Sequence, residues 1–160
     1  MSVAAVVGVA VPFVWCGAVL DISFLEAPLM FRAPGITRQL GLGIGMLVFR
    51  ALNLVELILA LALAAATAWA ATGTATGTAT SGTATSAAGT AVLVAIWLIL
   101  LAQLGGPRPV LERRARLVVA GETPPPTPLH LVYVGLEAIK LVLLPACGVL
   151  SLLAVASPAG

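Results

Sequence analysis

One polar stripe interrupts a stretch that otherwise consists mainly of Leu, Val, Ile and Ala: His130, Tyr133, Glu137 and Lys140. At 100° per residue of an α-helix, these side chains fall within about an 80° arc. Imidazole, phenol, carboxylate and ammonium groups on one face can bind a ligand, exchange protons or pair with one another. The stripe is therefore a candidate site, and its chemistry depends on the elements that hold it.

The composition places those elements in a membrane. The chain has 160 residues, of which 61% are hydrophobic and 9% charged. Soluble domains carry about 25% charged residues, so this chain cannot cover a water-facing surface. The first apolar stretch has no basic residue before it and no A-x-A pattern, which predicts a retained helix rather than a signal peptide.

Four apolar spans are predicted, at about residues 3–22, 42–69, 88–104 and 129–155. Each is long enough for a membrane helix, and the period-2 alternation of barrel strands is absent. Lipid admits only helices or closed barrels, because backbone polar groups must be satisfied internally. The sequence therefore predicts an all-α, integral membrane four-helix bundle that forms a single domain over residues 1–160.

The arginines predict the orientation of this bundle. Seven of them lie near the two connections that join span one to two and span three to four, and the connection between spans two and three has no charge. The positive-inside rule then places both termini outside the cytoplasm. We expect the membrane to be the bacterial cytoplasmic (inner) membrane.

The three connections differ in kind. Residues 21–40 mix apolar and charged groups and are expected at the membrane interface. Residues 72–90 form a Thr/Ala/Gly/Ser tract without large apolar side chains, which predicts a mobile external loop or frayed helix ends. Residues 109–120 predict a short cytoplasmic interfacial helix that begins near Pro109 and stops at Gly121.

Basic side chains next to this short helix have two interpretations. They either attract anionic lipid headgroups or serve only to fix the topology. The four residues concerned are Arg108, Arg113, Arg114 and Arg116.

Polar groups from all four spans converge on the predicted cytoplasmic half. Glu137 lies about 12 Å and Lys140 about 16 Å along the fourth span, at 1.5 Å per residue. Asp21 and Gln103 close spans one and three on the same side. The predicted binding pocket consists of His130, Tyr133, Glu137, Lys140, Glu56, Asn53, Arg50 and Glu26.

Two interpretations of these polar groups remain open. Glu137 and Lys140, at positions i and i+3, can pair within one helix, and Glu56 can pair with Lys140 or Arg50. Such a network would lock the helices together. However, interhelical polar contacts average only about 0.6 kcal/mol, whereas a buried charge costs about 2.5–3.5 kcal/mol to insert. This balance slightly favours a ligand, ion or proton site.

Several other chemistries are disfavoured. A metal centre would need converging His, Cys or carboxylates, and the chain has one His and no E-x-x-H pair. Cys16 and Cys147 have no C-x-x-C spacing and are expected to be buried apolar side chains. Gly41-x-x-x-Gly45 predicts close helix packing rather than a nucleotide loop. No catalytic residue, cofactor or nucleic-acid partner is predicted.

The layout resembles the transmembrane-protein-205-like family of uncharacterised small membrane proteins. The similar features are Trp15 in the first span, Pro28-Leu-Met-Phe31 after it, Phe49 opening the second, residues 103–108 leaving the third, and His130 opening the last. The resemblance implies a four-helix bundle. It does not extend to Glu56, Glu137 or Lys140.

The leading functional hypothesis is binding or transport of a small molecule, ion or proton through the polar pocket, with a homo-oligomer as one way to complete a path. The first alternative is a structural or accessory subunit whose polar network mediates assembly. The second alternative is a membrane enzyme that uses His130 as acid or base with Glu56 or Glu137 as its partner.

Overall fold

The computed structural model describes residues 2–75 and 87–156, and the side chains of 2–72 and 87–156. Helices account for all regular structure in these ranges, which confirms the predicted all-α class. The elements, in chain order, are α1 (Val3–Val19), the π-helical stretch η1 (Leu20–Glu26), α2 (Ala27–Met30), α3 (Arg38–Ala75), α4 (Ala87–Gly105), α5 (Pro107–Val119) and α6 (Leu129–Ala156).

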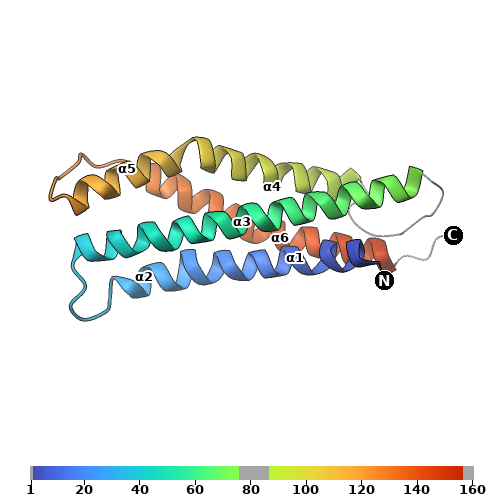
Figure 1. Cartoon of the computed structure of the whole chain (residues 1–160), viewed down its shortest axis with the longest axis horizontal. Helices are drawn as coiled ribbons and strands as arrows, with labels where there is room; N and C mark the ends of the chain where they lie inside the picture. Colours follow the sequence, from blue (N-terminus) through green and yellow to red (C-terminus); the bar gives the residue numbers. More distant parts are fainter. Residues whose placement is uncertain (1, 76–86, 157–160) are drawn as a thin grey trace.

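Four long helical segments pack side by side along one axis (Figure 1). They are Val3–Met30, Arg38–Thr72, Ala87–Val119 and Leu129–Ala156, and each is long and apolar enough to cross a membrane. The ends of α1 and α6 that carry the termini lie at one end of the bundle, and α2 and α5 lie at the other. We call these the termini end and the α5 end.

The first helical segment continues beyond the Ile22 at which the first span was expected to stop. The π-helical turns of η1 carry the chain from α1 into α2 without a break, so residues 21–30, which were expected at the membrane interface, are helical. Only the segment between Met30 and Arg38 turns the chain, and Gly35 adopts φ +81° there. The polar side chains Asp21 and Glu26 consequently lie on a helix.

A sharp break separates α4 from α5. The Gly106 amide donates to the carbonyl oxygen of Ala102 at 2.9 Å, and Pro107 starts the next helix. A Cβ at Gly106 would lie 2.8 Å from that same oxygen, so the turn requires glycine. The short helix expected near residues 109–120 is therefore present as α5, and it packs against α3, α4 and α6.

Close packing holds the bundle together. A cluster of buried side chains from α1, α3, α4 and α6 forms the core, whereas many large apolar side chains, such as Leu47, Leu98 and Val142, are exposed. An exposed apolar exterior is what lipid contact requires. The buried core residues are Trp15, Val19, Ala60, Leu63, Ile96, Leu100, Leu144 and Cys147.

Two further predictions concern small-residue segments. Gly41 is covered by the Phe31 ring and Gly45 lies next to Met30, so both glycines serve close packing of α3 against the end of the first segment. The Thr/Ala/Gly/Ser tract of 72–90 lies largely outside the described residues. At its edges, α3 continues to Ala75 and α4 already begins at Ala87.

Candidate functional site: a buried ionic cluster

Four charged side chains meet inside the bundle. Glu56 comes from α3, Arg108 from α5, and Glu137 and Lys140 from α6. The side chains of Glu56, Glu137 and Lys140 are 0% exposed and that of Arg108 is 9% exposed. We call these four residues the ionic cluster.

Lys140 bridges the two carboxylates of the ionic cluster. Its Nζ pairs with Glu56 Oε1 and lies 2.9 Å from Glu137 Oε2, one turn away on the same helix. Arg108 approaches Glu56 from the α5 end, with Nη2 at 2.5 Å from Oε2. Both oxygens of Glu56 are thus engaged by a cation from another helix.

Two neutral donors complete these contacts. Trp15 on α1 donates its Nε1–H to Glu56 Oε1 at 3.0 Å. Gln103 on α4 donates its Nε2–H to Glu137 Oε1 at 3.0 Å. The ionic cluster therefore connects α1, α3, α4, α5 and α6.

The charges of the ionic cluster balance. Two carboxylates face two cations, so their formal sum is zero. Attraction between opposite charges is strong in a low-dielectric interior, but it only offsets a large cost of desolvation. Removing one member would leave an uncompensated charge at a site that solvent does not reach.

An aromatic pair lies beside the ionic cluster. The Tyr133 ring meets the Phe49 ring edge to face, with centroids 6.0 Å apart and planes at 88°. The guanidinium carbon of Arg108 lies 5.9 Å from the centroid of the Tyr133 ring, within the range of a cation–π contact. Tyr133 thus joins Phe49 on one side to Arg108 on the other.

Several buried polar atoms around the ionic cluster have no hydrogen-bond partner among the described residues. The set mixes donors with acceptors, and leaving such a group unsatisfied costs about 1–3 kcal/mol. Buried polar groups in native proteins are normally paired with protein or water. The atoms are Arg108 Nε and Nη1, Tyr133 Oη, Asn53 Oδ1 and Gln103 Oε1, and we call them the unpartnered set.

Of the eight residues predicted to bind, five belong to the ionic cluster or lie beside it. Tyr133, Glu137 and Lys140 share the buried face of α6 as the stripe predicted, and Glu56 meets them from α3. Asn53 lies one turn from Glu56, half-buried, with its carbonyl oxygen in the unpartnered set.

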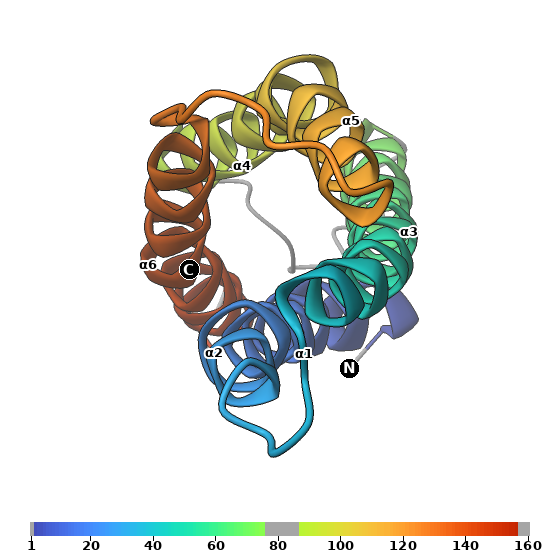
Figure 2. The same ribbon diagram turned by 90° about the vertical axis from the view of Figure 1, so that its left-hand side faces the viewer.

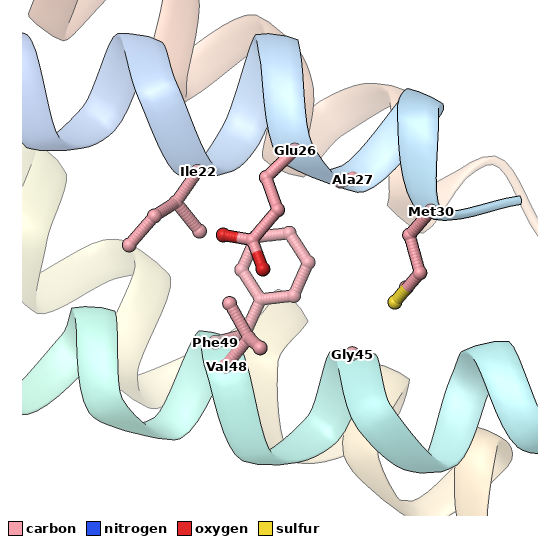
Figure 3. Close-up of a pocket in the computed structure, with 7 residues that line it drawn as sticks. All are labelled: Ile22, Glu26, Ala27, Met30, Gly45, Val48 and Phe49. Carbon is pink, nitrogen blue, oxygen red and sulfur yellow. The ribbon is translucent and has the colours of Figure 1, made fainter. Parts of the chain in front are cut away.

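The other three residues lie outside the ionic cluster. His130 and Arg50 are exposed, and His130 occupies the first turn of α6, beyond the part of the helix that packs in the core. Glu26 is also exposed and lines a small pocket between the η1–α2 segment and α3, shown in Figure 3. That pocket has a volume of about 10 Å³, enough for about one water molecule.

Sequence patterns missed part of the site. The basic pattern around Arg108 predicts contact with lipid headgroups or a role in topology, yet Arg108 pairs with Glu56, because α5 starts next to α3 after the break at Gly106. The sequence also did not indicate that Trp15 belongs to the site, because a tryptophan in an apolar span is usually interpreted as a hydrophobic core residue. A tryptophan buried in a membrane helix nevertheless has an N–H that needs an acceptor, and that requirement was the available clue.

Within residues 2–75 and 87–156, no group of three or more His, Cys, Asp or Glu side chains is placed to hold a metal ion. Comparisons with models of protein families, with curated proteins and with solved structures find no match to this chain. The fold and the site together define a small helical membrane protein with four candidate spans and a buried ionic cluster.

Proposed function

We propose that this protein binds a small polar molecule or ion at the ionic cluster, and that the ligand arrives from the α5 end. The observation that carries the proposal is the unpartnered set beside a charge-balanced cluster. A polar network that serves only to join helices stabilises the fold most when every buried donor and acceptor in it has a hydrogen-bond partner. Here Arg108 retains unused donors and Asn53 and Gln103 retain unused acceptors, which a bound polar species would satisfy.

The distribution of charge favours binding over conduction. In the described residues, α1 before Trp15, α3 after Glu56, α4 before Gln103 and α6 after Lys140 carry no charged side chain. A charged species that crossed the whole bundle would need charged partners at the termini end as well, where the buried polar side chain on α6 is the neutral Ser151. We therefore favour a site that opens on one side over a channel or carrier.

The second candidate is a structural or accessory subunit, and the pairing of Glu56, Glu137 and Lys140 with one another favours it. In that role the ionic cluster fixes the relative positions of five helices, and the exposed apolar faces contact lipid or another subunit. The enzyme alternative has less support, because His130 is exposed while Glu56 and Glu137 are fully buried.

Native mass spectrometry of the protein purified in mild detergent tests the first candidate against the second. Binding predicts a small-molecule adduct on the wild-type protein and on Arg113→Gln, and loss of the adduct in Arg108→Gln. Arg113 is the matched control because it is exposed on the same helix. A wild-type protein that carries no small adduct but a stable protein partner or a second copy would favour the accessory role.

Orientation, membrane and lipid contacts belong to the same proposal. Following the arginine distribution, we place the α5 end in the cytoplasm and the protein in a bacterial inner membrane. Arg113 and the 66%-exposed side chain of Arg116 are available to anionic headgroups, whereas Arg108 is engaged by Glu56. The resemblance to the transmembrane-protein-205-like family implies the four-helix bundle only, and it gives no orientation or lipid contact.

A further inference from the structure

The small pocket beside Glu26 lies directly next to the aromatic pair. Its walls come from the η1–α2 segment and from α3, with the Glu26 carboxylate projecting towards the Phe49 ring (Figure 3). Glu26 is exposed, and Phe49 is half-buried. The pocket is thus bounded by a solvent-accessible carboxylate and by an aromatic ring that belongs to the interior.

Phe49 links this pocket to the ionic cluster. The ring that lines the pocket also meets Tyr133 at 6.0 Å between centroids, and Tyr133 in turn contacts Arg108. Arg108 is ion-paired with Glu56 at 2.5 Å. Phe49 therefore belongs both to the pocket that Glu26 lines and to the contacts that lead through Tyr133 to the buried cluster, and the Phe49–Tyr133 contact is the apolar step between them.

We propose that Phe49 is the gate between the Glu26 pocket and the ionic cluster. The proposal deepens the binding function above and rests on it: the ligand waits beside Glu26 and passes when the Phe49 ring rotates away from Tyr133. A half-buried phenylalanine ring is held by fewer neighbours than a core ring, so its rotation disturbs less packing.

The pocket also defines the class of ligand. A volume of about 10 Å³ admits a species of about the size of water. The Glu26 carboxylate can only accept hydrogen bonds when ionised, and Asn53 Oδ1 and Gln103 Oε1 beyond the gate are acceptors as well. The unpartnered donors of Arg108 need an acceptor in turn, so the ligand is a small polar species that both donates and accepts hydrogen bonds.

A thiol at residue 53 tests the gate. Asn53 lies one helical turn from Phe49 and its carbonyl oxygen is buried, so Asn53→Cys is introduced in a Cys16→Ala/Cys147→Ala background. Because the side chain is half-buried, the change in modification rate caused by a substitution at Phe49, and not the rate itself, reports access past the ring. The probe is a methanethiosulfonate ethylammonium reagent added to protein in detergent. We expect Phe49→Ala to raise the modification rate at least about tenfold, because removing the ring leaves a cavity.

Val48→Ala is the matched control, since Val48 lines the same pocket and is the neighbour of Phe49 on α3. Its rate should stay within about twofold of the parent, because a smaller void is created away from Tyr133. Equal rates in parent and Phe49→Ala, or equal acceleration in both variants, would overturn the gate. If Phe49→Ala does not fold, Phe49→Leu takes its place, and an unchanged rate there overturns the proposal too.

The two proposals fail separately. Thiol modification needs no ligand, so the gate can be disproved while an adduct is still seen by mass spectrometry. Conversely, residue 53 could become accessible in Phe49→Ala while the wild-type protein carries no adduct. That result would support Phe49 as a gate and reject the binding function.

Discussion

At the scale of single residues, Glu56 is the side chain on which the other members of the ionic cluster converge. It accepts from Trp15, pairs with Lys140 and pairs with Arg108, which come from three other helical elements. The rest of the ionic cluster depends on this carboxylate, because both cations contact it. Neutralising Glu56 would leave two cations facing the single carboxylate of Glu137.

Glu56→Gln is therefore expected to destabilise the protein strongly. Breaking a buried ion pair on one side costs about 3–5 kcal/mol. Thermal unfolding in detergent measures the effect. Glu112→Gln is the control, because Glu112 pairs with Arg116 at the surface, where such a change stays within about 0.5 kcal/mol. Similar melting temperatures for the two variants would contradict the ionic cluster.

A second prediction concerns the pair within α6. Glu137→Gln and Lys140→Met should each destabilise, and the double variant should lose less than the sum of the two. Residues in one ion-pair network typically show coupling energies of about 0.5–3 kcal/mol. Unfolding free energies of the two single variants and the double variant measure this coupling. Strict additivity would mean that the 2.9 Å contact contributes nothing.

At the scale of elements, a backbone break and an ion pair both help to position α5. The break at Gly106 sets its direction, and the Arg108–Glu56 pair ties its first turn to α3. Figure 2 views the bundle from the α5 end, with α5 at the rim beside α3. One glycine thus sets the direction in which this 13-residue helix leaves α4, and one ion pair ties its first turn to α3, in addition to its packing against α3, α4 and α6.

Gly106→Ala should loosen α5. Its Cβ would meet the Ala102 carbonyl oxygen at 2.8 Å, and backbone atoms of a packed helix cannot yield easily. We expect faster amide hydrogen exchange over residues 107–119 and a lower melting temperature. Gly105→Ala is the control, since a Cβ there meets nothing within 4 Å. Equal exchange in both variants would show that the break does not position α5.

The elements also show what sequence alone can predict. The stripe on α6 could be read from spacing, because residues at i, i+4 and i+7 share a helix face whatever surrounds it. The residues on other helices that contact this stripe could not be predicted from spacing, because packing sets the rotation of each helix about its axis. Leu54 and Val55 are exposed between buried Leu52 and Glu56, and no apolar pattern in a lipid-facing helix distinguishes them.

At the scale of the whole molecule, charge and topology are linked. The first turn of α1 and the last turn of α6 lie at the end of the bundle opposite α5 and its arginines (Figure 1). The four spans and their helical class followed from composition, since a chain this apolar has few other ways to fold. The π-helical continuation through Leu20–Glu26 could not be predicted from composition, because charged residues such as Asp21 and Glu26 are typical of a connection at the membrane interface.

Site-directed labelling tests the predicted orientation. In the cysteine-free background, Ser2→Cys should react with a membrane-impermeant maleimide in intact spheroplasts. Thr123→Cys, in the exposed α5–α6 connection, should react only after the cells are broken. The opposite pattern would reverse the orientation, and the α5 end would then face outward.

The absence of charged side chains from the described part of the termini end has an energetic consequence. A binding site that opens to one side of the membrane equilibrates with that compartment only. Its occupancy then follows the ligand concentration in that compartment and not the difference in ligand concentration across the membrane. A charge that crosses the whole membrane gains or loses about 2.3 kcal/mol per 100 mV. A charge that stops at the ionic cluster crosses only part of that field. Under the proposed one-sided binding, the protein would respond to the amount of ligand in one compartment and would not drive it across the membrane.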